Sequence, residues 1–217
     1  YEALARWPQP LGGFTSPAEF IPVAEQTGQI VEISHFVLER SIKFLALLNQ
    51  DHPHRYVAVN LSVQLFDRID IVSTIRALLS KYAVNPNNLH VELTESVFIE
   101  DFVLVTNVLQ QLRELGVQVS LDDFGTGFSS LSMLHKLPID IVKVDRSFVL
   151  EVSKGSESRK IAESVMLLAK TLNKKVIVEG IETKDQIAFS ESFDCDALQG
   201  FYFHKPVPAS VILTASA

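Results

Sequence analysis

The sequence has one cysteine, no long apolar run and no excess of basic residues, and each absence excludes a class of protein. The single Cys195 excludes an intramolecular disulfide framework and favours a reducing compartment. No run approaches the roughly 18 apolar residues needed to cross a bilayer, and no basic-then-apolar signal segment opens the chain. We therefore expect a cytoplasmic domain with no membrane insertion by this segment.

The charge balance is acidic. The 26 Asp and Glu residues outnumber the 19 Lys and Arg residues, which gives a net charge of −7. This balance argues against DNA as a partner, because a binder of the phosphate backbone needs a basic face. It leaves open a phosphate substrate held through a metal ion. With 47% apolar residues over 217 positions, the chain can bury a sizeable core, which excludes wholesale disorder.

Short β-branched runs recur along the chain, and each ends in a polar residue. These ends are Asn60, Glu92, Asp122, Lys143, Glu179 and Gln199. Such runs are typical of buried parallel strands. Apolar residues at three- and four-residue spacing predict the helices between them. The predicted helices are 18–27, 33–49, 71–82, 102–115 and 159–172. The Gly- and Pro-rich segment from Pro8 to Pro17 indicates a loop.

Strand followed by helix, with strand ends about 20 to 36 residues apart, is the pattern of an α/β protein. A further strand ending near Glu2 gives seven strand ends. A (β/α)8 TIM-like barrel needs eight, so we expect its first strand and helix to be missing from this N-terminally truncated stretch. A doubly wound open sheet is the competing architecture. It gathers ligands at one switch point, whereas polar residues at every strand end favour the barrel.

In a barrel, these strand ends converge on one mouth, where carboxylates would accumulate. The acidic residues expected there are Glu2, Glu92, Asp122, Asp123, Asp145 and Glu179, with the amides Asn60 and Gln199 and the single cation Lys143. Carboxylates this dense repel each other, a conflict that divalent cations resolve. Oxygen ligands of this type suit Mg²⁺ or Mn²⁺.

The adjacent Asp122 and Asp123 are informative because successive side chains of a strand point to opposite faces. Both can reach one cavity only where the backbone turns, and Phe124-Gly-Thr-Gly is expected to supply that turn. One carboxylate bridging two ions, with its neighbour on the second, would build a two-metal hydrolytic site.

These motifs resemble those of the EAL domain, a bacterial phosphodiesterase that hydrolyses cyclic di-GMP. The matching segments are Glu2-Ala-Leu-Ala-Arg-Trp7, Phe20-Ile-Pro-Val-Ala-Glu25, Val59-Asn-Leu-Ser62, Glu92-Leu-Thr-Glu-Ser96, Asp122-Asp-Phe-Gly-Thr-Gly-Phe-Ser-Ser130, Lys143-Val-Asp145, Glu179-Gly-Ile-Glu182 and Gln199-Gly200. They follow the family's order along residues 1–217. The family's first strand, which carries a Gln-Pro pair that touches substrate, is not among them.

The resemblance implies a role for each matching residue. Glu2, Asn60, Glu92 and Asp122 match the ligands of one divalent ion, and Asp122 with Asp123 match those of a second. Lys143 and Glu179 match the pair that orients and activates the attacking water, with Gln199 helping to hold it. Arg6 matches a contact to the non-scissile phosphate. Glu182 and Asp145 are expected on the substrate side, although Asp145 could instead only position Lys143. Glu95 matches the anchor of the Asp-Phe-Gly-Thr-Gly loop.

The family further implies cyclic di-GMP as substrate, two Mg²⁺ or Mn²⁺ ions, a homodimer, and an upstream sensor or cyclase domain in a longer protein. Two other interpretations remain. Some family members lose metal ligands and only bind the dinucleotide, but such members have broken Glu-Ala-Leu or Asp-Asp-Phe-Gly motifs, and both motifs are intact here. A lysine on a barrel strand can also form a Schiff base. Carboxylates around Lys143 disfavour that chemistry because they keep the amine protonated.

Overall fold

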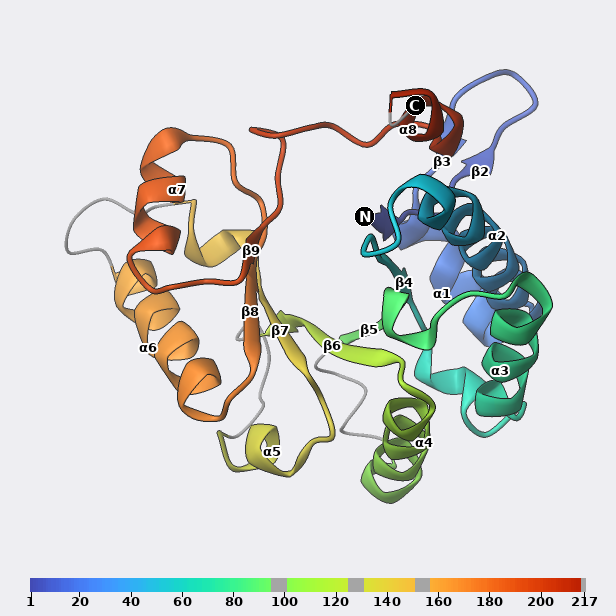
Figure 1. Cartoon of the computed structure of the whole chain (residues 1–217), viewed down its shortest axis with the longest axis horizontal. Helices are drawn as coiled ribbons and strands as arrows, with labels where there is room; N and C mark the ends of the chain where they lie inside the picture. The colour runs from blue at the N-terminus through green and yellow to red at the C-terminus, as the bar shows by residue number, and fades with distance from the viewer. Residues whose placement is uncertain (95–100, 125–130, 151–156, 216–217) are drawn as a thin grey trace. The chain divides into compact units, whose positions relative to one another are not determined.

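A computed structural model describes residues 1–94, 101–124, 131–150 and 157–215 (Figure 1). The predicted loop anchor Glu95 and the Gly-Thr-Gly segment therefore lie outside the described residues. The chain divides into two compact units. Unit 1 contains residues 1–92, 101–118 and 207–215, and unit 2 contains residues 93–94, 119–124, 131–150 and 157–206. Each unit combines parallel strands with helices.

Three parallel strands run through unit 1 in the order β1 (Glu2–Ala3), β4 (Val57–Asn60) and β5 (Leu89–Thr94), the last two residues of β5 belonging to unit 2. Asn60 lies opposite Glu92 in the β4–β5 register. The three residues before Asn60 in β4 are buried, as are the first five of β5. Asn60 ends β4 after a buried apolar run, as predicted, whereas Glu92 was predicted to end its strand but lies within β5, which continues to Thr94.

The first four helices of unit 1 begin and end close to the predicted positions, whereas the short helix of residues 209–215 was not predicted. The helices of this unit are α1 (Pro17–Thr27), α2 (Ile30–Asp51), α3 (Ile71–Tyr82), α4 (Phe102–Leu115) and α8 (Ala209–Ala215), with short 3₁₀ turns η1 (Val63–Leu65) and η2 (Pro86–Asn88). Ser16 caps α1 by accepting from Ala18 N. Gly116 ends α4 with a φ of 99°, a left-handed conformation in which glycine carries no steric penalty. Helix α2 packs against α1 and α3 (Figure 1).

The segment from Pro8 to Pro17 is not entirely a loop. Strand β2 (Trp7–Pro8) pairs antiparallel with β3 (Phe14–Thr15), and the backbone turns between them through Gly12 and Gly13, both at positive φ. Each strand has only two residues, which is too short for an alternating pattern to be visible in the sequence.

Four parallel strands run through unit 2 in the order β6 (Gln118–Phe124), β7 (Ile141–Val144), β8 (Lys175–Val178) and β9 (Ala197–Leu198). The first residue of β6 belongs to unit 1. The intervening helices are α5 (Leu131–Lys136), η4 (Arg146–Phe148), α6 (Glu157–Thr171) and α7 (Lys184–Glu191). All four residues of β7 are buried, including Lys143.

Two aspartates fix the amino ends of these strands in the same way. The Asp140 side chain accepts from Val119 N at 3.0 Å, while Asp140 N donates to Val119 O at 2.8 Å. Asp196 makes the equivalent pair of bonds to Val176, both at 2.8 Å. Each aspartate thus closes the beginning of a strand against its neighbour, at the end of the strands opposite to the polar cluster described next.

Candidate metal centre and active site

Three carboxylates of unit 2 form a cluster that could hold a metal ion. One oxygen from each of Asp122, Asp123 and Glu179 lies within 4.8 Å of the others. The two aspartates come from β6, and Glu179 directly follows β8. The donor set is all oxygen, the kind that hard divalent cations such as Mg²⁺ and Mn²⁺ prefer. The cluster therefore fits the predicted type of metal ion.

A β-bulge explains how the neighbours Asp122 and Asp123 reach the same cluster. Leu121 lies opposite Val142 and Phe124 lies opposite Val144, so β6 contains one more residue than β7 over this stretch. Asp123 takes up the extra residue with a φ of 53°, in the left-handed region, and its N–H donates to Asp122 Oδ1 at 3.0 Å. The turn that brings both carboxylates together thus lies at the bulge itself, within the strand.

Lys143 is the buried cation of the cluster. Its side chain on β7 is almost fully buried, and its Nζ lies 2.7 Å from Glu179 Oε1 and 3.2 Å from Asp122 Oδ1. A buried ammonium requires such partners, because an uncompensated charge away from water is costly. Two ion pairs also stabilise the protonated amine, which is not nucleophilic. This geometry disfavours the Schiff-base interpretation of Lys143.

The predicted ligands of unit 1 also lie together. Asn60 Nδ2 donates to Glu2 Oε1 at 3.0 Å, linking the ends of β1 and β4. Glu92 lies opposite Asn60 on β5 and is only 2% exposed. Unit 1 thus carries Glu2, Asn60 and Glu92, while unit 2 carries the three-carboxylate cluster and Lys143.

The remaining predicted site residues have identifiable contacts. Gln199 follows β9, where its N–H donates to Val178 O and its carbonyl accepts from Ile181 N. Glu182 Oε1 lies 3.8 Å from a guanidinium nitrogen of Arg146.

Asp145 and Arg6 have local backbone contacts. The Asp145 side chain accepts from Ser147 N and so caps η4. Arg6 is exposed, and its guanidinium donates to Ala5 O. These contacts locate the side chains and leave their functional roles as predictions.

The sequence analysis missed Gln186, a polar residue of α7 that is only 4% exposed. Thr183 and Gln186 form a capping box at the start of α7. The Thr-x-x-Gln spacing before a helix is a recognisable signature, so this residue could have been found from the sequence.

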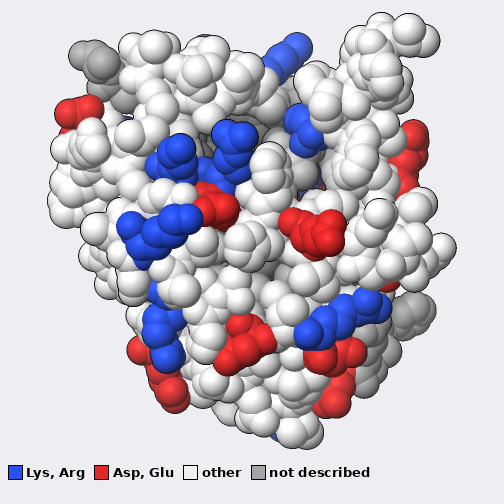
Figure 2. All heavy atoms as spheres, turned by 90° about the vertical axis from the view of Figure 1, so that its right-hand side faces the viewer, with Lys and Arg blue, Asp and Glu red and all other residues white. Residues whose placement is uncertain are grey.

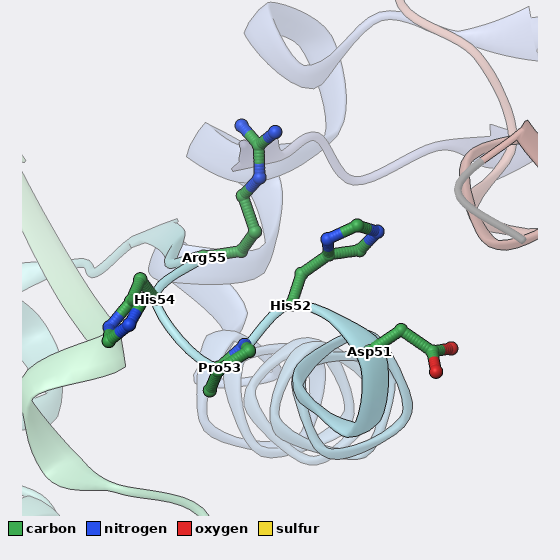
Figure 3. A pocket seen from close by; sticks show the side chains of 5 residues that line it. All are labelled: Asp51, His52, Pro53, His54 and Arg55. Atoms are coloured by element: carbon green, nitrogen blue, oxygen red, sulfur yellow. The ribbon is translucent and has the colours of Figure 1, made fainter.

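A pocket in unit 1 is separate from these residues. It is lined by Asp51, His52, Pro53, His54 and Arg55, in the connection between α2 and β4. Figure 3 shows His52 and Arg55 extending to one side of this connection and His54 to the other. The connection precedes β4, whereas Asn60 lies at the far end of that strand. The pocket therefore does not belong to the candidate metal centre.

On the face drawn in Figure 2, Lys and Arg are interspersed with Asp and Glu. Among the described residues, no helix is long and apolar enough to cross a membrane.

The comparison with protein families identifies the family of the chain. The EAL domain family profile matches residues 1–206. The bifunctional diguanylate cyclase/cyclic di-GMP phosphodiesterase MucR of Pseudomonas aeruginosa is 39% identical over all of this chain, which covers 32% of that protein. The cyclic di-GMP phosphodiesterase PdeR of Escherichia coli is 38% identical over 96% of the chain, which covers 32% of PdeR. The chain thus spans about a third of the length of these curated relatives.

Solved structures agree with this match. The structure described as the PaMucR phosphodiesterase in complex with c-di-GMP has a TM-score of 0.91 and 39% identity, covering 97% of this chain and 86% of that one. The EAL enzyme Bd1971, bound to cAMP and cyclic di-GMP, has a TM-score of 0.93 and 31% identity, covering 100% of this chain and 60% of that one. The chain belongs to the EAL domain family, and its fold is of the expected TIM-like barrel class.

Proposed function

We propose that this chain is a metal-dependent phosphodiesterase domain that hydrolyses cyclic di-GMP to linear 5′-pGpG. The observation that carries the proposal is the cluster of Asp122, Asp123 and Glu179 around the buried Lys143. The cluster supplies oxygen ligands for a cation next to a fixed ammonium. Relatives named as cyclic di-GMP phosphodiesterases support the substrate. We further propose that residues 1–217 act as one domain.

From the family motifs, we assign Glu2, Asn60, Glu92 and Asp122 to one Mg²⁺ or Mn²⁺ ion, and Asp122 with Asp123 to a second. The carboxylates present in both units fit such ions. Such ions, when bound, would make the attacking water more acidic and would neutralise charge on the phosphate.

The protein's own residues orient the reactants. Lys143 and Glu179 are held 2.7 Å apart, and we assign to this pair the orientation and activation of the attacking water, with Gln199 beside it. The water oxygen forms a bond to phosphorus and the bond from phosphorus to the 3′-oxygen breaks. That oxygen takes up a proton to give the free 3′-hydroxyl of 5′-pGpG.

Other predicted residues would hold the dinucleotide and the site. Arg6 would contact the non-scissile phosphate, and Glu182 and Asp145 would lie on the substrate side. Glu95 would anchor the loop that follows Asp123. Arg6 is assigned from its place in the Glu-Ala-Leu-Ala-Arg-Trp motif, and its positive charge suits a phosphate.

The assembly and location of the protein form part of the proposal. We expect a homodimer. We also expect a sensor or cyclase domain elsewhere in the full protein, since the relative MucR is named as both a diguanylate cyclase and a cyclic di-GMP phosphodiesterase. The lone Cys195 and a nucleotide substrate favour the cytoplasm.

One experiment separates hydrolysis from binding alone. The purified protein is incubated with cyclic di-GMP, with Mg²⁺ or with EDTA, and the products are separated by chromatography. We expect 5′-pGpG only with Mg²⁺. Tight binding of cyclic di-GMP without product in saturating Mg²⁺ would instead identify a receptor module. The intact carboxylate cluster argues against that outcome.

A further inference from the structure

The side chain of Gln186 makes three hydrogen bonds from a buried position in the first turn of α7. Its Oε1 accepts from Glu182 N at 2.7 Å and from Thr183 N at 2.9 Å. Its Nε2 donates to Val149 O at 3.0 Å. The first two bonds are local to the beginning of α7. The third crosses to the segment that follows β7, 37 residues earlier in the chain.

The two segments that Gln186 joins are those that carry the reactive pair. Residues 179–183 begin with Glu179, and residues 145–149 directly follow the β7 strand that carries Lys143. They approach so closely that a Cβ at Gly180 would lie 2.1 Å from Arg146 Cβ. Gly180 also has a φ of 68°, which disfavours any other residue. A side chain at position 180 would therefore collide with Arg146.

The same segment is held on its other side by the residues after β9. Ile181 N donates to Gln199 O at 3.0 Å, and Tyr202 N donates to Ile181 O at 2.9 Å. A Cβ at Gly200 would meet the Ile181 backbone at 2.1 Å. The segment 179–183 is therefore fixed between the parts of unit 2 that supply Lys143 and Gln199.

We propose that Gln186 is a positioning residue for the hydrolytic reaction, which keeps Glu179 in register with Lys143 by tying segment 179–183 to Val149. This inference rests on the proposed function. The competing explanation is that Gln186 only caps a helix. A capping box needs the Oε1 bond and the Thr183 hydroxyl, but it does not need the bond from Nε2 to Val149. Catalytic groups require placement within about 0.5 Å, so loss of this cross-link is expected to reduce turnover.

Two variants and a control separate these explanations. Gln186→Glu keeps an acceptor for Glu182 N and Thr183 N but places a carboxylate oxygen against Val149 O. Gln186→Met has a similar length and removes both the acceptor for Glu182 N and Thr183 N and the donor to Val149 O. Thr183→Ala is the control: it removes the hydroxyl that accepts from Gln186 N at 3.3 Å and leaves the bond to Val149 intact. Gln186→Met and Thr183→Ala weaken the helix cap, which Gln186→Glu keeps, whereas only the two Gln186 variants cut the cross-link to Val149.

Turnover of cyclic di-GMP by the full-length protein in saturating Mg²⁺ is the first measurement. We expect Gln186→Glu to lower kcat about tenfold or more near pH 8.5 with KM changed less than about threefold, and Thr183→Ala to stay within about twofold of the wild type. At lower pH the Gln186→Glu deficit should shrink, because a protonated carboxyl can again donate to Val149 O. Gln186→Met should show the deficit at every pH, and it decides the question if the glutamate variant does not fold.

The inference is overturned if kcat of both Gln186 variants lies within about fivefold of Thr183→Ala near pH 8.5. If the wild type converts no cyclic di-GMP, the proposed function fails, and amide hydrogen exchange decides the structural part. Peptides covering residues 179–183 should then exchange about fivefold faster in Gln186→Glu than in Thr183→Ala. Equal exchange would show that Gln186 does not hold the segment.

Discussion

Replacing Lys143 by methionine tests the central feature of the site, the buried cation between two carboxylates. Methionine keeps the length and apolar stem of the side chain and removes the ammonium. The side chains of Asp122 and Glu179 are 12% and 19% exposed, so both would lose a partner in a largely buried setting. Removing one member of a buried ion pair costs about 3–5 kcal/mol. Since both carboxylates retain some contact with water, we expect a loss in unfolding free energy of about 3 kcal/mol.

Lys143→Met is expected to lower the unfolding free energy but not the affinity for Mg²⁺. The ammonium lies 3.2 Å from Asp122 Oδ1 and competes with a metal ion for carboxylate charge. Lys143→Met should therefore bind Mg²⁺ at least as tightly as the wild type, and Mg²⁺ should stabilise the variant more than the wild type. The turnover number should nevertheless fall by about a thousandfold, which corresponds to roughly 4 kcal/mol of activation free energy.

Kinetics and unfolding measured together provide the assay. The turnover number is determined as a function of Mg²⁺ concentration, and urea unfolding is followed with and without Mg²⁺. Lys174→Met is the matched control, because Lys174 Nζ donates to Ile139 O at 2.7 Å and precedes β8, whereas Glu179 follows it. The control should lose stability but keep turnover within about twofold. Full recovery of Lys143→Met at saturating Mg²⁺ would refute our reasoning, since Lys143 would then serve metal binding alone.

Three further predictions concern the metal and the framework. Glu92→Gln removes one anionic ligand from a 2% exposed position; we expect turnover to fall more than about tenfold, and a smaller loss in a Mg²⁺ titration would argue against Glu92 as a ligand. Ca²⁺ in place of Mg²⁺ should give little turnover, because Ca²⁺ prefers more ligands at longer distances; equal rates with both ions would contradict the two-metal proposal. Burial opposes ionisation of Asp196, but hydrogen bonds from Lys170 and from Val176 N outweigh it and lower its pKa. Asp196→Asn should therefore cost under about 1 kcal/mol at neutral pH, and this difference should vanish as pH falls through the lowered pKa; a difference that persists in acid would be inconsistent with this ion pair.

The sequence predicted best those elements whose first and last residues are determined by residues adjacent in the sequence. Helices α3 and α4 have the predicted ends, because Asp70 and Asp101 cap their first turns and Gly116 ends α4 in a left-handed conformation. The buried strands could be predicted because each contains a short apolar run that is followed by a polar residue. The family motifs placed Glu2, Asn60 and Glu92 on neighbouring strands, and the register of β4 with β5 agrees.

Features that depend on pairing between distant segments could not be derived in this way. The bulge at Asp123 arises from a register shift between β6 and β7, and no local pattern in β6 marks the extra residue. The bond from Gln186 to Val149 joins residues 37 positions apart, and a glutamine on a short helix otherwise indicates an exposed surface. The two-residue strands β2 and β3 are too short to show periodicity.

The bulge also explains why a regular strand with the same residues would not bring the two adjacent aspartates together. In a regular strand, Asp123 would point away from Asp122, and the proposed second metal ion would lose a ligand. In this fold, the N–H of Asp123 donates to Asp122 Oδ1, so the backbone of one ligand orients the side chain of the other. Lys143 contacts the same Asp122 oxygen from the neighbouring strand. Asp122 is thus fixed from two directions, by an amide and by an ammonium, which suits a carboxylate proposed to bridge two ions.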